Sequence, residues 1–389
     1  MMIKSKEVLN KCNVYLTLIF VYNMQGTFYG YGSMLAKFVL LIFLLFSAYF
    51  WVVTNRKYKL PKILKTLNVL IIMFTIYGIV LDLFEPNIIA RFSGMEYLKN
   101  IYTSLLPVYA CYYFSKKSYL NAKSIRVWFG LFVIMSVGKF FAYENQRLAN
   151  TIYDVDGLTN NIAYYFVALI PMTYLFRTRS IIQYISLLFI LLFVIYGMKR
   201  GAILIALVLF VLLLNNNFEA SSNKNKFLLL ILCVSVIIFL AEFVSFISST
   251  SNYFQYRVES TLEGSSSNRE DYYLTFFDYF ARIQNPLTLL FGSGAYATVR
   301  INGNLAHNDW FEILINNGVV GIVIYMIYMK RFWNLYWKNR NTIYSLVLLS
   351  LFIFCFFKSL YSMSYGLIPI MITVMLGYTL VQIECKNEL

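Results

Sequence analysis

The chain has 389 residues, of which 60% are hydrophobic and only 13% are charged. A water-soluble domain of this length does not need so large an apolar share, so the composition excludes that class and indicates a polytopic membrane protein. The formal net charge is +15. Because Lys and Arg gather in short segments between apolar runs, this charge indicates membrane topology rather than nucleic-acid binding.

Apolar runs recur along the whole chain, and each is long enough for a helix to cross a hydrocarbon layer of about 30 Å. We expect about twelve transmembrane helices. They cover residues 14–30, 34–54, 65–84, 97–114, 125–143, 159–176, 181–198, 201–214, 227–247, 309–329, 342–357 and 365–382. The predicted fold class is all-α. One integrated domain would combine an N-terminal bundle (1–247), a loop (248–306) and C-terminal helices (307–389).

The positions of the basic residues predict the orientation of these helices, because short loops rich in Lys and Arg stay in the cytoplasm. They gather before the first span and then in alternate loops. These residues are Lys4, Lys6, Lys11, Arg56, Lys57, Lys59, Lys62, Lys116, Lys117, Lys123, Arg126, Arg177, Arg179, Lys224, Lys226, Lys330, Arg331, Lys338 and Arg340. Both termini are therefore predicted to be cytoplasmic, and the 248–306 loop to lie outside.

The five cysteines lie in or beside predicted spans, or at the cytoplasmic end, and none lies in the long outer loop. They are Cys12, Cys111, Cys233, Cys355 and Cys385. This distribution indicates neither a disulfide framework nor a zinc site. The N-terminal apolar segment lacks a convincing small-residue cleavage site, so we expect a retained helix.

The long outer loop contains one segment with aromatic residues at helical spacing, from 269 to 283. It predicts an amphipathic helix that packs on the bundle or lies at the membrane surface; the alternative is a helix that only covers the loop. Further on, Gly292-Ser293-Gly294 predicts a tight turn that returns the chain toward His307. Long loops in compact proteins usually carry function.

His307 is the only histidine of the chain, and it stands where a polar stretch runs into an apolar helix. An imidazole at a water-facing helix entry is a candidate general base near neutral pH. The alternative is a polar residue that only caps the helix. If His307 is a base, Asp309 or Glu312 could orient it, next to Asn308.

Two outer arginines are the second feature. Arg200 lies in Gly197-Met198-Lys199-Arg200-Gly201, a connection so short that the flanking spans must form a tight hairpin at the membrane surface. Arg269 opens the amphipathic segment. Both can place a permanent cation at a lipid headgroup; the alternatives are snorkelling to the interface for Arg200 and a solvated helix-end charge for Arg269. Three further arginines of the same loop could substitute, Arg257, Arg282 and Arg300.

Together these motifs resemble the O-antigen polymerase and O-antigen ligase family of bacterial membrane glycosyltransferases. Lys199-Arg200-Gly201 is similar to the family's Ser-Arg-Gly turn, with Lys in place of Ser. Ser267-Asn268-Arg269 with Tyr272-Tyr273 is similar to its loop arginine motif. The most specific likeness is His307-Asn308 followed by Phe311-Glu312-Ile313-Leu314 and Gly318-Val319-Val320-Gly321. The resemblance covers roughly the C-terminal half of the chain.

The resemblance implies a GT-C-like fold in the bacterial inner membrane and an active site on the periplasmic face. Glycan would pass from undecaprenyl diphosphate to a sugar hydroxyl on a second lipid. His307 would be the base, with Asn308, Asp309 and Glu312 in support, while Arg200 and Arg269 would bind the diphosphate in place of a metal. The implied partners are the lipid-linked oligosaccharide, membrane lipid, a chain-length regulator and a flippase, with no nucleic acid and no cofactor.

Asp154-Val155-Asp156 is the one competing motif, since D-x-D binds a metal-nucleotide in many sugar transferases. It lies in an outer loop, where nucleotide sugars are absent. We interpret it as a solvated acidic loop.

Polymerase and ligase differ only in the acceptor, which is another lipid-linked repeat unit or lipid A core. The high counts of Tyr (33) and Phe (35) resemble proteins of AT-rich surface-polysaccharide gene clusters and favour a polymerase. A ligase remains open, as does a capsule polymerase. The alternative from another class is a lipid-linked oligosaccharide flippase or secondary transporter.

Overall fold

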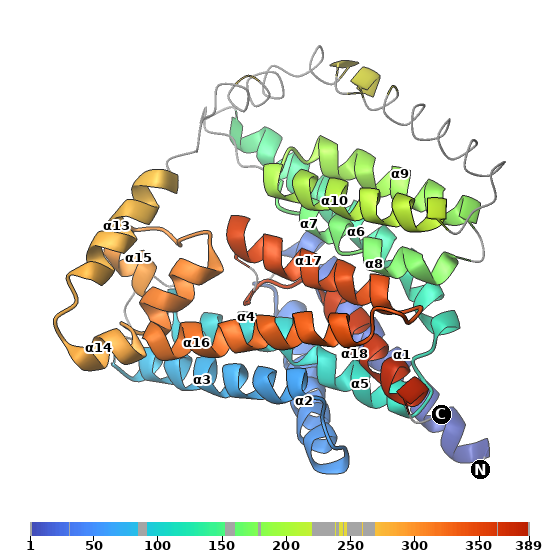
Figure 1. Ribbon diagram of the computed structural model, residues 1–389, viewed down its shortest axis with the longest axis horizontal. Coiled ribbons are helices and arrows are strands. Elements are labelled where there is room, and N and C mark those ends of the chain that lie inside the picture. The colour runs from blue at the N-terminus through green and yellow to red at the C-terminus, as the bar shows by residue number, and fades with distance from the viewer. Residues whose placement is uncertain are drawn as a thin grey trace. The chain divides into compact units, whose positions relative to one another are not determined.

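The structure is a computed structural model that describes residues 2–30, 32–84, 92–151, 160–177, 180–219, 269–363 and 365–387, with a few single positions between 238 and 259. Every regular element in these ranges is a helix (Figure 1). The predicted all-α class is therefore confirmed. Four of these helices are long and apolar enough to cross a membrane, as a polytopic membrane protein requires.

Those four helices correspond to predicted spans. They are α2 (Met34–Lys57), α3 (Lys62–Phe84), the Ala122–Asn145 part of α6 (Ala122–Thr151) and α16 (Asp309–Lys338). On α2, Phe38, Leu41 and Leu45 recur at helical spacing and are each more than half exposed. Such an apolar stripe is the surface that a membrane helix presents to lipid.

Five shorter apolar helices accompany them, at Ala163–Phe176, Ile181–Tyr196, Arg200–Asn216, Ser345–Tyr361 and Ile370–Cys385. The predicted first span falls in α1 (Met2–Tyr29). The predicted span at 227–247 lies almost entirely outside the described residues, so the count of about twelve stays a prediction.

The predicted span at 97–114 is not a single helix. The chain forms α4 (Gly94–Leu105) and then α5 (Pro107–Lys116), which starts at a proline. Proline has no backbone N–H and so favours the first position of a new helix over the interior of a long one. Tyr109, Cys111 and Phe114 of α5 are nevertheless fully buried, so this segment is part of the core.

A similar break divides the predicted span at 159–176. The structure has three short helices there, α7 (Ala163–Val167), α8 (Ile170–Thr173) and the 3-10 helix η2 (Tyr174–Phe176). Pro171 stands in the first turn of α8. Phe166 stacks on Phe193 of α9 (Ser180–Tyr196), with ring centroids 4.6 Å apart, so α9 holds the broken segment.

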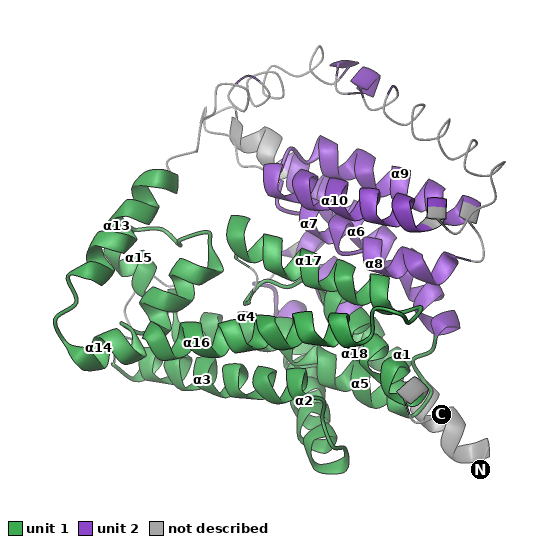
Figure 2. Cartoon of the chain, viewed as in Figure 1, with its two compact units in different colours: residues 1–18, 38–121, 266–389 green, residues 19–37, 122–265 purple. Residues whose placement is uncertain are grey.

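The chain divides into two compact units (Figure 2). Unit 1 comprises residues 1–18, 38–121 and 266–389, and unit 2 comprises residues 19–37 and 122–265. Unit 2 therefore contains α6 to α9 and α10 (Arg200–Glu219). The predicted division of the chain into an N-terminal bundle (1–247), a loop (248–306) and C-terminal helices (307–389) concerns membrane topology and stays a prediction.

Unit 1 carries the helices of the C-terminal third. Three short ones come first, α13 (Arg269–Ala281), α14 (Pro286–Phe291) and α15 (Ala297–Asn302). They are followed by α16, α17 (Ser345–Tyr361) and α18 (Ile370–Asn387). In Figure 1, α3 and α16 run side by side. Arg331 of α16 donates to the Lys62 carbonyl of α3 at 3.1 Å, which fixes one end of this pair.

Helix α16 is bent at Gly318, whose φ of 65° and ψ of −164° are not helical. The bend frees two carbonyls of the first half of the helix. Ser293 N donates to the Ile315 carbonyl at 2.9 Å, and Gly294 N donates to the Asn316 carbonyl at 3.0 Å. The predicted Gly292-Ser293-Gly294 turn thus satisfies backbone groups that a break in a membrane helix would leave without partners.

Both glycines at this contact are required by space. A Cβ on Gly318 would lie 2.5 Å from Gly292 N, and a Cβ on Gly292 would lie 2.4 Å from the Asn316 carbonyl. Gly321 is similarly restricted, because a Cβ there would lie 2.3 Å from the Asn317 side chain. The Gly-x-x-Gly sequence is therefore the signature of this bend.

Candidate active site

His307 is exposed and lies in the last turn before α16. Its φ is 51°, a left-handed conformation that few residues other than glycine adopt readily. The residue that caps α16 is its neighbour Asn308, whose side-chain oxygen accepts from Trp310 N at 2.9 Å and from Phe311 N at 3.3 Å. The capping alternative for His307 is thus wrong, since Asn308 has that task.

Glu312 holds the peptide that precedes His307. Its carboxylate is fully buried and accepts three hydrogen bonds, from Ala306 N at 2.9 Å, Thr298 Oγ1 at 2.7 Å and Asn316 Nδ2 at 3.0 Å. A buried carboxylate is tolerated when its lone pairs are satisfied in this way. Glu312 therefore fixes the left-handed turn through the Ala306 backbone.

Asp309 is also fully buried and faces the interior of unit 1. Its Oδ2 accepts from Tyr325 OH at 3.0 Å and from the backbone N–H of Tyr365 at 3.2 Å. The buried ammonium group of Lys358 interacts electrostatically with this carboxylate. Lys358 also donates to the Met363 carbonyl, and to the Leu367 carbonyl at 3.3 Å. Asp309 and Lys358 together hold the connection between α17 and α18.

The C-terminal end of α17 binds two residues of the predicted site, Asn308 and Arg269, together with Trp310. Trp310 Nε1 donates to Ser359 Oγ, Asn308 Nδ2 to the Leu360 carbonyl and Arg269 Nη1 to the Tyr361 carbonyl, each at 3.1 Å. Carbonyls at a helix end lack helical partners and carry partial negative charge, so they suit such donors. The structure thus brings the loop arginine and the helix entry to the same turn of α17.

Helix α13 is the predicted amphipathic helix, and it packs on this region. Phe276 is fully buried in a cluster with Ala297, Ala306 and Ile315. Tyr273 stacks on Phe311 with ring centroids 5.0 Å apart. These contacts connect α13, which begins at Arg269, to both sides of the His307 turn. Leu274 and Phe277 of the same helix are more than 60% exposed.

Arg200 lies in unit 2, at the first residue of α10. The connection from α9 is tight, because Gly197 N bonds to the Phe193 carbonyl at 3.0 Å and Met198 adopts a left-handed φ of 53°. The predicted tight hairpin between α9 and α10 is therefore confirmed, and its place at the membrane surface stays a prediction. The other predicted site residues are all assigned to unit 1, namely Arg269, His307, Asn308, Asp309 and Glu312.

Asp154 and Asp156 lie outside the described residues, as do Ser267 and Asn268. Within the described ranges, no group of three or more His, Cys, Asp or Glu side chains could hold a metal ion.

The binding partners at the end of α17 were not predicted. Leu360 and Tyr361 take part through backbone carbonyls, which no residue type reveals. Lys358 did carry a signal, since an ionisable residue within an apolar segment usually faces the protein interior and pairs with a partner there.

Residues 164–326 match the family model described as O-antigen ligase. The matched region contains Arg200, Arg269 and His307, together with Gly318 and Gly321 of the Gly-x-x-Gly sequence. This match supports the resemblance to the O-antigen polymerase and ligase family over these residues, and that family implies a glycosyltransferase-like activity. No curated protein matches the chain.

Proposed function

From this family match, we propose that the protein is a surface-polysaccharide polymerase. It transfers glycan from undecaprenyl diphosphate to a sugar hydroxyl of a lipid-linked repeat unit at the periplasmic face of the inner membrane. The observation that carries the proposal is the shared attachment of Arg269 and Asn308 to neighbouring carbonyls of α17. It supports a site where a cation and an exposed imidazole act on the same substrate.

In this mechanism His307 takes the proton of the acceptor hydroxyl, and the oxygen attacks the anomeric carbon of the donor sugar. The bond from that carbon to the diphosphate oxygen breaks, and undecaprenyl diphosphate leaves with the electron pair. Negative charge grows on the leaving group, where cations are most effective.

Arg269 is suited to bind that charge. A guanidinium group has five N–H donors, and among the described residues Arg269 makes one hydrogen bond, to the Tyr361 carbonyl. The other donors are available for the phosphate oxygens, and the planar fork matches them in pairs. Arg200 is proposed to bind the same diphosphate, as the family's hairpin arginine does.

Ligase activity is the second candidate, because the matching family model bears that description. We prefer a polymerase because of the high Tyr and Phe content noted above. The two differ in the acceptor, so the purified protein is tested with the lipid-linked repeat unit alone and with lipid A core added. Polymer on the lipid carrier supports a polymerase, and glycan on lipid A core supports a ligase.

The same assay tests the remaining alternative and the role of metals. A flippase would move the lipid-linked glycan across vesicles without forming any new glycosidic bond, which would overturn the proposal. The transfer reaction should continue in the presence of a chelator of divalent metals, since the arginines are proposed to stabilise the leaving group. Loss of activity with the chelator would instead direct attention to Asp154 and Asp156.

A further inference from the structure

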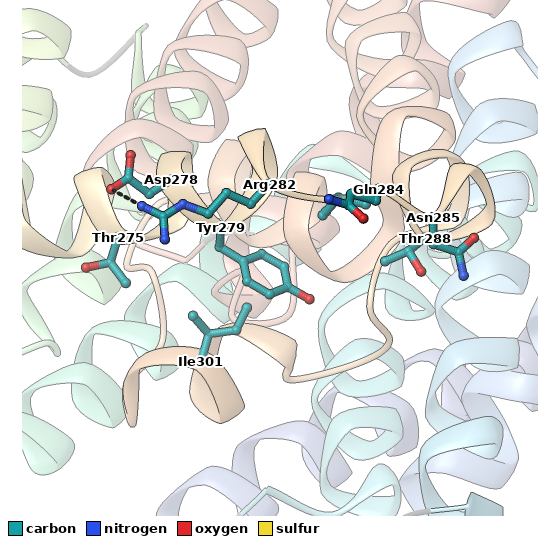
Figure 3. Close-up of a pocket in the computed structure, with 9 residues that line it drawn as sticks. Thr275, Asp278, Tyr279, Arg282, Gln284, Asn285, Thr288 and Ile301 are labelled. Carbon is teal, nitrogen blue, oxygen red and sulfur yellow. Dashed lines mark ion pairs between the residues drawn. The ribbon is translucent and has the colours of Figure 1, made fainter.

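Unit 1 has an open pocket, lined by both polar and apolar side chains, that none of the predicted site residues lines. Figure 3 shows it between the C-terminal half of α13, the start of α14 and α15. Helix α13 contributes Thr275, Asp278, Tyr279 and Arg282, while Gln284 and Thr288 lie before and within α14.

The chemistry of the pocket suits a sugar. It combines the phenol ring of one tyrosine with a carboxylate, a guanidinium, two amides and the hydroxyl groups of two threonines, so it can both donate and accept hydrogen bonds. Gln284 and Thr288 have side chains without a hydrogen-bond partner in the part of the chain that the structure describes. These groups are available to the hydroxyl groups of a ligand.

The Tyr279 ring, which is the aromatic group of the pocket, is held in place. Tyr279 OH is 2.8 Å from Ser293 Oγ, and its ring packs against the cluster of Phe276 and Ala306. In Figure 3 the Tyr279 ring lies beside Ile301, which comes from α15. A ring fixed at both ends loses little freedom when a sugar ring packs on its face, which favours binding.

The pocket lies at a useful distance from Arg269. Both are on α13, and at about 1.5 Å per residue Tyr279 is roughly 15 Å along the helix axis from Arg269. This separation is too long for a diphosphate but fits an oligosaccharide of a few sugar rings. The same cluster that packs around Tyr279 includes Ala306, the residue before His307.

We propose that this pocket binds the distal sugars of the donor glycan while Arg269 binds the diphosphate. The proposal rests on the proposed transferase function. It assigns α13 the task of selecting the donor by its glycan, at a point away from the bond that breaks.

The test compares two donors, the complete lipid-linked repeat unit and the same lipid carrier trimmed to its first sugar. Arg282→Ala and Gln284→Ala should each raise KM for the complete donor about tenfold, which is the loss of one or two good hydrogen bonds. The KM for the trimmed donor and kcat for both should stay as in the wild type. Arg340→Ala removes an exposed arginine after α16 and should change neither.

Binding of the free oligosaccharide, followed by saturation-transfer NMR in detergent, separates this proposal from the proposed function. A wild-type protein that binds the oligosaccharide but transfers no glycan would overturn the function and keep the pocket. Equal KM values for the complete donor in wild type, Arg282→Ala and Gln284→Ala would overturn the pocket and keep the function. If either variant fails to fold, Thr288→Val removes a hydroxyl without changing the side-chain shape, and it must give the same selective rise in KM.

Discussion

Arg269 and Asn308 are 39 positions apart in the sequence and donate to the adjacent carbonyls of Tyr361 and Leu360, each at 3.1 Å. One is the first residue of α13, and the other caps α16. The end of α17 is therefore a common support for the two motifs, and a displacement of this helix end would move the cation and the helix entry together.

Replacing His307 should stop glycan transfer. Loss of a positioned base typically costs roughly 10²- to 10⁴-fold in rate, so the long-chain ladder on a gel should be absent. His307→Asn and His307→Gly are the preferred variants, because Asn and Gly tolerate the left-handed backbone at this position. Gel filtration in detergent should show that both remain folded, since His307 is exposed. A normal ladder from folded His307→Asn protein would end the base hypothesis.

The Arg269→Lys variant keeps the charge but loses the paired donors. We expect KM for the lipid-linked donor to rise by about 10- to 100-fold, as the loss of charge-assisted hydrogen bonds implies. Arg200→Lys should have a similar effect, whereas Arg340→Lys should leave KM unchanged. Steady-state kinetics with purified donor give the measurement. Equal KM values for Arg269→Lys and Arg340→Lys would contradict the diphosphate assignment of Arg269.

Glu312→Gln should loosen the turn before His307. Gln brings an NH₂ group to a place where Glu312 accepts from Ala306, Thr298 and Asn316, so at least one donor loses its acceptor. The expected loss of stability is about 1–3 kcal/mol, measured as a lower Tm in detergent, together with reduced kcat. Asp271→Asn, at an exposed position of α13, is the control. An unchanged Tm in Glu312→Gln would show that these bonds do not support the turn.

Gly318→Ala should damage the bend in α16. Its backbone conformation is one that essentially only glycine adopts, at a cost of about 1–3 kcal/mol for other residues, and the added Cβ would meet Gly292 N at 2.5 Å. Thermal unfolding should show a clear loss of Tm. Gly130→Ala in α6 is a matched control, because a Cβ there meets nothing within 4 Å. Equal Tm values for the two variants would mean that the bend is not needed.

The sequence predicted those features that depend on residue type and spacing. Apolar runs located α2, α3 and α6, aromatic spacing located α13, and the polar-to-apolar transition located the start of α16. Hydropathy could not reveal the break at Pro107, because the flanking residues are apolar on both sides, nor the bend at Gly318, because an apolar run continues beyond it. In both places the residue that permits the break was visible, but its consequence depends on tertiary packing.

The sequence predicted only those features of the site that depend on side-chain chemistry. Asn308 caps α16 and its neighbour His307 is exposed. Which of the two residues is the cap depends on backbone angles, which a sequence pattern does not specify. Every residue at the end of a helix has a backbone carbonyl, so the residue types of Leu360 and Tyr361 do not reveal these contacts. Contacts of this kind become visible only when α17 and the His307 turn are placed together.

The buried pair of Asp309 and Lys358 also has a consequence for biogenesis. Helix α16 is synthesised before α17, so Asp309 leaves the ribosome tens of residues ahead of its cation. A buried charge without its partner is strongly unfavourable, by about 3–5 kcal/mol when one member is removed. Insertion of the two helices as a hairpin avoids this intermediate. These two membrane segments would then be accepted by the translocon as a pair, and a chain that ends between them would be a substrate for quality control.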